Sequence, residues 1–262
     1  MIAPDGTAFD LHGPNVGNAV VLVHGLGINR QMWIPLISDL CEQYSVVTYD
    51  LYGHGESALP PEKPGLSVYA NQLQSLLDYL SISSAAIVGF SLGGMINRRL
   101  AMDHPERIKS LMILNSPHER GEEQQRIVEE RASDSENGPA ATLNAAIDRW
   151  FTEEFIRSNP DYIAQIRHWI LANDSKVFAE CRQVLAYGVR ELIGPEPPIT
   201  HPALVMTCEK DSGSTPVMSL AIASEIEGAE AIIVPRLRHM GLVEQPELFT
   251  KPILRFLSSA GV

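Results

Sequence analysis

The apolar positions of the chain form short uninterrupted runs, separated by longer stretches with helical spacing. Runs rich in Val, Ile and Leu that end at Gly, Pro, Asp or Asn are typical of strands covered on both faces. Six such runs predict strands at residues 19–23, 45–49, 85–89, 110–114, 203–207 and 231–234. Between them, apolar residues recur every three or four positions, as at Tyr69, Leu73, Leu76, Leu77 and Leu80. This alternation predicts an α/β fold with a mostly parallel central sheet flanked by helices.

The alternation stops between about Pro117 and Pro198, where helical spacing continues but β-branched runs are missing. Consecutive prolines at 197 and 198 mark the return to the sheet, because they cannot continue a helix. We therefore expect a helical cap at residues 117–198, inserted into a core made of residues 1–116 and 199–262. A chain of 262 residues can form these parts as one integrated unit.

The net charge of the chain argues against nucleic acid as a partner. The chain has 20 Lys+Arg against 32 Asp+Glu, a net charge of −12, and no basic block of the kind that binds nucleic acid. Residues 118–198 hold 15 acidic and 9 basic side chains, so half of the excess charge falls in the predicted cap.

The chain also lacks the usual marks of a membrane or secreted protein. No apolar run approaches the roughly 18 residues of a membrane span, and the first residues do not resemble a signal peptide. The three cysteines are widely separated, and none has metal-ligand spacing. We expect a cytoplasmic protein with buried, reduced thiols, no metal, and neither nucleic acid nor a membrane as partner.

A candidate nucleophile lies between a predicted strand and a predicted helix. Residues 89–93, Gly-Phe-Ser-Leu-Gly, match the G-x-S-x-G pattern, which places Ser91 on a sharp strand-to-helix turn. The flanking glycines suit a strained backbone with close packing. At the start of a helix, free amides favour the oxyanion that forms when a carbonyl is attacked. This context predicts a catalytic serine.

Two further residues complete a catalytic set in the appropriate order. Asp211 comes just after the predicted strand at 203–207, before a helix that starts with Pro216. His239 lies in the loop after the strand at 231–234. Serine, acid and histidine in this chain order are characteristic of one hydrolase fold. The turn at residues 24–27, His-Gly-Leu-Gly, follows the first predicted strand, where a loop can provide a second oxyanion amide.

With these motifs, the chain resembles the α/β-hydrolase superfamily over nearly its whole length. The turn at 24–27, the segment 50–57, the serine turn, Asp211 and His239 carry the resemblance. Residues 149–155 with Asn159-Pro160, and residues 211–216, resemble the 3-oxoadipate enol-lactonase and carboxylesterase group.

The resemblance implies a role for each of five residues. Ser91 would be the nucleophile, His239 the base and Asp211 the residue that orients it. The backbone N–H groups of Leu26 and Leu92 would form the oxyanion hole. Neither a cofactor nor a metal is implied.

We therefore expect a serine hydrolase for a small ester or lactone, with a 3-oxoadipate enol-lactone-like substrate as the first choice. A cofactor-free perhydrolase remains an alternative. So does a carbon–carbon bond hydrolase, although such enzymes often carry Trp after the histidine and this chain has Met240. From another class, a small-ligand receptor with negligible turnover would keep the same residues. The sequence leaves the oligomeric state open.

Several polar residues are ambiguous. We expect Asp50 and His24 to hold their turns rather than catalyse. Arginines of the predicted cap could clamp a substrate carboxylate or pair with local carboxylates: Arg120, Arg126, Arg131, Arg149 and Arg167. Four of its aromatic residues could belong to the core or to a pocket: Trp150, Phe151, Trp169 and Phe178. An acidic cap would repel an anionic substrate unless arginines line its inner face.

Overall fold

A seven-stranded sheet forms the centre of the computed structural model, which describes residues 1–14 and 17–261. Its strands are β1 (Phe9–His12), β2 (Ala19–Val23), β3 (Ser45–Tyr49), β4 (Ala85–Phe90), β5 (Ile108–Leu114), β6 (Ala203–Cys208) and β7 (Glu230–Val234). The spatial order is β1-β3-β2-β4-β5-β6-β7, and only β1 runs antiparallel to its neighbour among these strands. Parallel strands end at one edge, so the loops that follow them meet there.

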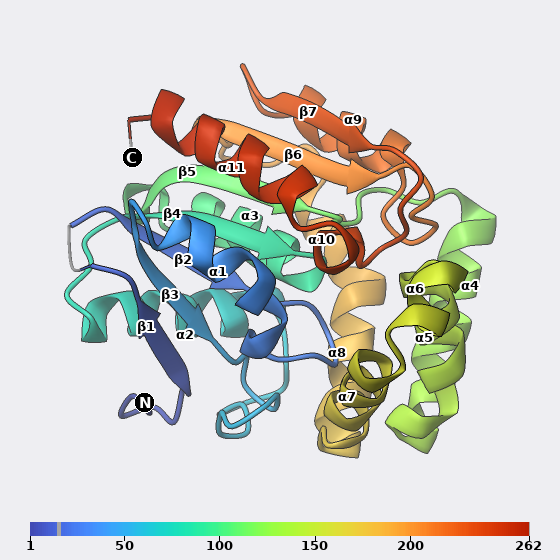
Figure 1. Ribbon diagram of the computed structural model, residues 1–262. Helices are drawn as coiled ribbons and strands as arrows, with labels where there is room; N and C mark the ends of the chain where they lie inside the picture. Colours follow the sequence, from blue (N-terminus) through green and yellow to red (C-terminus); the bar gives the residue numbers. More distant parts are fainter. Residues whose placement is uncertain (15–16, 262) are drawn as a thin grey trace.

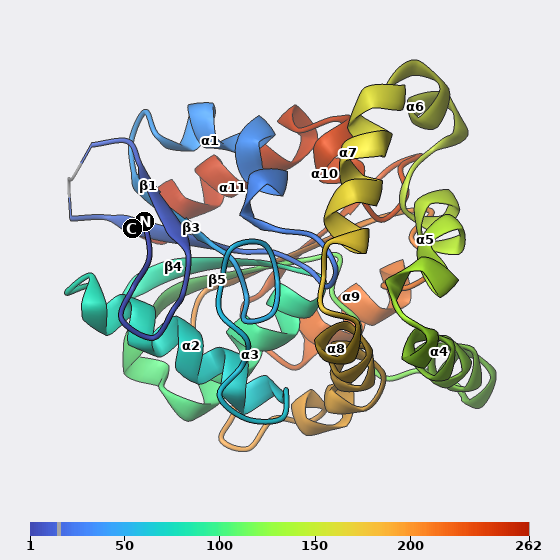
Figure 2. The same cartoon turned by 90° about the horizontal axis from the view of Figure 1, so that it is seen from below.

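Helices cover both faces of the sheet (Figure 1). The helices around the sheet are α1 (Ile34–Leu40), α2 (Leu66–Tyr79), α3 (Leu92–Asp103), α9 (Pro216–Ser224), α10 (Gly241–Glu244) and α11 (Glu247–Ser259), with 3-10 turns η1 (Arg30–Trp33) and η2 (Pro105–Arg107). Figure 2 shows α1 and α11 on one face and α2, α3 and α9 on the other. The sheet is therefore buried on both sides, which explains its continuous apolar strands.

A group of helices interrupts the alternation between β5 and β6. It comprises α4 (Glu122–Asp134), η3 (Ser135–Asn137), η4 (Pro139–Thr142), α5 (Leu143–Trp150), α6 (Glu153–Ser158), α7 (Pro160–Leu171), α8 (Ser175–Tyr187) and η5 (Gly188–Leu192). These helices lie together beside the carboxyl ends of the parallel strands (Figure 1). The insertion therefore lies next to the loops that carry the predicted site.

The predicted mostly parallel sheet is confirmed, and each of the six predicted strands is present with ends that differ by at most two residues. The edge strand β1 was not predicted. Of its four residues, Phe9 is buried, Asp10 and His12 are partly exposed, and Leu11 is exposed. Such a short, partly polar strand gives little signal in the sequence, and it is positioned by its antiparallel pairing with β3.

Two other expectations concern the cysteines and the membrane. All three cysteines are free, and Cys181 and Cys208 are buried as predicted. The prediction is wrong for Cys41, which is partly exposed because it lies at the surface end of α1. Within residues 1–14 and 17–261, no helix has the length and apolarity to cross a bilayer.

Candidate active site

Ser91 lies on a strained turn between β4 and α3. Its φ of 54° and ψ of −112° place a non-glycine residue in a rarely populated region. A Cβ on Gly89 would lie 2.2 Å from the carbonyl oxygen of Gly93, and one on Gly93 would lie 2.1 Å from that of Val23. The turn is also held by the Ser91 amide, which donates to the Leu114 carbonyl at 2.8 Å. Only glycine on each side allows this approach of helix to strand.

Asp211 and His239 form a direct pair. The imidazole Nδ1 lies 2.6 Å from Asp211 Oδ2, which also accepts a hydrogen bond from Asn115 Nδ2 at 2.9 Å. The other carboxylate oxygen accepts from the amides of Gly213 at 2.9 Å and Ser214 at 3.0 Å. Donors on both oxygens fix the carboxylate, and an Nδ1–H donated to it leaves Nε2 of His239 available to accept a proton.

The environment keeps Asp211 charged although it is 2% exposed. Burial by itself raises the pKa of this carboxyl, but the His239 imidazole and the hydrogen bonds outweigh it, and the pKa falls below its usual value. An ionised carboxylate at this position stabilises a positive charge on His239.

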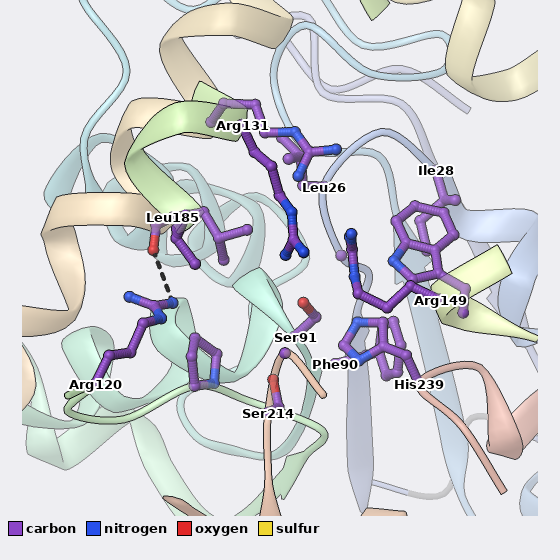
Figure 3. A pocket seen from close by; sticks show the side chains of 16 residues that line it. Leu26, Ile28, Phe90, Ser91, Arg120, Arg131, Arg149, Leu185, Ser214 and His239 are labelled. Atoms are coloured by element: carbon purple, nitrogen blue, oxygen red, sulfur yellow. Dashed lines mark hydrogen bonds between the residues drawn. The ribbon is translucent and has the colours of Figure 1, made fainter. Parts of the chain in front are cut away.

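Ser91 and His239 line one cavity between the sheet and the insertion (Figure 3). The His239 ring lies against Phe90 and Trp150, with ring centroids 4.9 Å and 6.1 Å away. Among the described residues, no hydrogen bond joins the Ser91 hydroxyl to His239. Such contacts often tighten only when a substrate is bound.

Two backbone amides near Ser91 are candidates for an oxyanion hole. A Cβ on Gly25 would lie 3.2 Å from Ser91 Cβ, so the loop after β2 packs against the serine turn. Within the described part of the chain, neither the Leu26 amide in this loop nor the Leu92 amide at the start of α3 donates a hydrogen bond. Free amides beside a nucleophile can stabilise an oxyanion.

The arrangement can be compared with known proteins. The sequence model of the family described as alpha/beta hydrolase fold matches residues 18–132. The crystal structure of an enol-lactonase from Burkholderia xenovorans LB400 superimposes with a TM-score of 0.87 at 28% identity, over 96% of each chain. The chain has the α/β-hydrolase fold. The predicted resemblance to this superfamily is thereby confirmed.

Two further relatives are similar to this chain over most of its length. The 3-oxoadipate enol-lactonase 2 of Acinetobacter baylyi is 29% identical over 237 residues, covering 90% of this chain and 86% of the relative. A thermophilic esterase from Thermogutta terrifontis, solved with malate bound, has a TM-score of 0.86 at 26% identity, covering 98% and 94%. The similarity therefore includes both the sheet and the insertion.

His24 and Asp50 both bond to the loops around them. His24 Nδ1 lies 2.7 Å from the Gly25 carbonyl, and its Nε2 accepts from the Leu51 amide at 2.9 Å. Burial lowers the pKa of His24 to about 4, so the ring is neutral. Asp50 is buried and pairs with the Arg30 guanidinium. Both side chains therefore have structural partners.

Asn115 is a site residue that sequence reasoning missed. It follows β5 with a φ of 47°, and its side chain reaches both Asp211 and Thr207. The available signal was an Asn directly after a predicted strand, at the edge where the other site residues emerge. In the sequence, Asn115 marks the end of that strand, and nothing connects it with Asp211.

The ambiguous residues of the insertion fall into two groups. Arg120, Arg131 and Arg149 line the cavity, together with Trp150 and with Arg182, which sequence reasoning did not name. The remaining residues lie elsewhere: Arg126 beside Glu130, Arg167 bonded to Asn144, and Phe151, Trp169 and Phe178 in the core. Arg182 was hidden within the apolar face of α8. Among the described residues, no three His, Cys, Asp or Glu side chains could hold a metal.

Proposed function

We propose that this protein is a serine hydrolase that cleaves a small carboxylic ester or lactone through an acyl-enzyme. The observation that carries the proposal is the geometry of the cavity. A strained Ser91 and an Asp211-bound His239 line the same cavity, next to two free amides. This is the set of groups that acyl transfer requires.

In the first half of the reaction, His239 Nε2 takes the hydroxyl proton of Ser91 while the oxygen attacks the carbonyl carbon. The amides of Leu26 and Leu92 hold the oxyanion, and Asp211 stabilises the imidazolium. When the intermediate collapses, the carbon–oxygen bond to the alcohol or enol breaks and His239 returns the proton to it. A lactone opens at this step without losing its leaving group.

In the second half, His239 takes a proton from water as the water oxygen attacks the acyl carbon. Collapse breaks the bond to Ser91, which regains its proton, and the acid leaves. The relatives support this chemistry, since their names include an enol-lactonase and an esterase. The proposal also assigns residues 117–198 the role of a cap over the serine.

Contacts between the insertion and the catalytic loops support that role. Asn173, after α7, donates to the Gly27 carbonyl at 3.1 Å, beside the predicted oxyanion amide. The Thr152 amide donates to Glu244 at 2.8 Å, and the Met240 amide donates to the Trp150 carbonyl at 2.8 Å. The insertion is thus attached to the loops on both sides of the reaction centre.

The test is turnover combined with covalent labelling. Wild-type protein should hydrolyse members of a panel of 4-nitrophenyl esters and lactones, including 3-oxoadipate enol-lactone, and a fluorophosphonate should label Ser91. Ser91→Ala should lose the label and at least about three powers of ten in kcat, because no other group can form the acyl-enzyme.

The exposed Ser133 provides a control, and Ser133→Ala should match the wild type. Residual Ser91→Ala activity within tenfold would show that another residue is the nucleophile. If the wild-type protein neither turns over the panel nor takes the label, the receptor alternative replaces the enzyme.

A further inference from the structure

Four arginines of the insertion converge on the cavity that contains Ser91. Arg120 precedes α4, Arg131 lies on α4, Arg149 on α5 and Arg182 on α8, and all four side chains line the cavity. Figure 3 shows the first three around the serine hydroxyl. No Asp or Glu is among the described residues that line this cavity. The cavity is therefore strongly cationic, although the insertion as a whole is acidic.

These arginines have no carboxylate partner. None of the four forms an ion pair within the described part of the chain. There, the Arg131 and Arg149 side chains have no hydrogen bond either, and buried Arg182 packs over Phe178 with its Nε unpartnered. Arg120 donates only to neutral oxygens, such as a main-chain carbonyl of α8 (Figure 3).

The lowered pKa values of the guanidinium groups show that this arrangement has an electrostatic cost. Burial, followed by the charges of Arg149 and Arg131, lowers the pKa of Arg182 to about 9. Burial, followed by Arg131, lowers that of Arg149 to about 10, and the carboxylate that acts against this is Asp211, which already binds His239. The guanidinium groups remain charged at neutral pH, and Arg131, Arg149 and Arg182 repel one another, which does not stabilise the fold. A ligand is the remaining source of counter-charge.

Given the proposed function of Ser91, we infer that the substrate is a polycarboxylate: an ester or lactone that bears at least two free carboxylates, bound by Arg120, Arg131, Arg149 and Arg182. One carboxylate has two oxygens and can pair with one guanidinium in a fork or bridge two. Four arginines therefore require two carboxylates. A lactone with a single carboxylate, such as 3-oxoadipate enol-lactone, would leave at least two of them unpaired.

A second feature gives such a substrate a route of approach. Arg131 and Arg149 also line an open hollow, together with Lys210 and Arg238 from the loops after β6 and β7. Asp148 is the acidic residue among those that line it. This local excess of positive charge counters the repulsion expected from an acidic insertion and leads an anion toward the two shared arginines.

The first experiment compares three esters that differ in their number of free carboxylates: 4-nitrophenyl butyrate, mono-4-nitrophenyl glutarate and a mono-4-nitrophenyl ester of tricarballylate. We expect kcat/KM to rise by about 10- to 100-fold with each additional carboxylate, mainly through KM, because each one can form a charged hydrogen bond to an arginine. Equal kcat/KM values for the three esters would overturn the inference.

Variants test whether the arginines cause this preference for carboxylate-bearing esters. Arg149→Gln and Arg182→Gln should each lower kcat/KM for the tricarballylate ester at least tenfold more than for the butyrate ester. Arg126→Gln is the matched control, because Arg126 lies exposed on α4 outside the cavity, and it should leave the preference unchanged. If Arg149→Gln, at a partly exposed position, lowers kcat/KM for both esters equally, the inference is wrong.

The second experiment does not depend on catalysis. Calorimetry on the Ser91→Ala variant should show that tricarballylate binds at least tenfold more tightly than glutarate, with butyrate weaker still. Inorganic phosphate serves as a competing anion, and tighter binding of phosphate than of tricarballylate would overturn the carboxylate assignment. Tricarballylate binding by a wild-type protein without turnover would refute only the proposed function of Ser91. Turnover of neutral esters with no carboxylate preference would refute only this inference.

Discussion

At the scale of single residues, Asp211 and Asp50 illustrate what a sequence can and cannot distinguish. Both follow a strand at the same edge of the sheet, and both are buried. Their partners differ: Asp211 accepts from an imidazole, whereas Asp50 pairs with the Arg30 guanidinium and accepts the Glu56 amide at 2.9 Å. We propose that the first contact serves proton transfer, whereas the second closes a turn.

Substitution by asparagine should separate these roles. Asp211→Asn should lower kcat by roughly 10³ to 10⁴, because it spoils the tautomer and orientation of His239. Asp50→Asn should instead destabilise the fold by about 1–3 kcal/mol, since Arg30 loses a charged partner. Kinetics and urea unfolding of both variants test this. A larger loss of kcat in Asp50→Asn would mean that the acid has been assigned incorrectly.

At the scale of elements, the contact between α3 and β2 positions the site. Gly93 lies where a Cβ would meet the Val23 carbonyl oxygen at 2.1 Å, so the start of α3 is pressed against the end of β2. The loop after β2 also packs against this turn, since a Cβ on Gly25 would lie 3.2 Å from Ser91 Cβ. Strand-to-helix context predicted the turn, but only the pairing of β2 with β4 brings the loop after β2 against it.

Gly93→Ala tests the contact. The added methyl group must push α3 away from β2, and overpacking of this kind costs about 1–3 kcal/mol. We expect a loss of that size in urea unfolding and at least a tenfold fall in kcat/KM, because the Leu92 amide moves. Gly121 has no atom within 4 Å of an added Cβ, so Gly121→Ala should match the wild type. If Gly93→Ala behaves like this control, the contact does not position the site.

At the scale of the whole molecule, the net charge of −12 conceals a strong local asymmetry. The insertion contributes half of that charge, yet the cavity between it and the sheet presents four arginines and no carboxylate among its described lining. In the folded chain, acidic residues of the insertion lie outside this cavity, whereas four of its arginines line it.

We expect two buried histidines, His24 and His54, to make the stability of the molecule depend on pH. Burial lowers the pKa of His24 to about 4, and burial followed by His24 lowers that of His54 to about 3. In the unfolded chain both bind protons near pH 6.5, so below that value the unfolded state takes up more protons than the folded state. The free energy of unfolding should therefore fall by about 1.4 kcal/mol per pH unit for each histidine as pH drops from 6.5 toward 4.

Urea unfolding at pH 7, 6, 5 and 4.5 measures this slope. His54→Asn should remove about half of it, whereas substitution of the exposed His168 should leave it unchanged. Stability that is constant between pH 6 and 4.5 would contradict the assignment of neutral, buried imidazoles.

The sequence by itself determined the six parallel strands in their order along the chain, the serine turn and the expected triad. Each of these rests on the spacing of neighbouring residues or on their order along the chain. Only the tertiary structure decided that Asn115 bonds to Asp211 across 96 positions, and that Arg182 lines the cavity while Arg126 faces solvent. Side chains of one type, on helices of similar pattern, differ in where they point, and that direction follows from how each helix packs against the rest of the molecule.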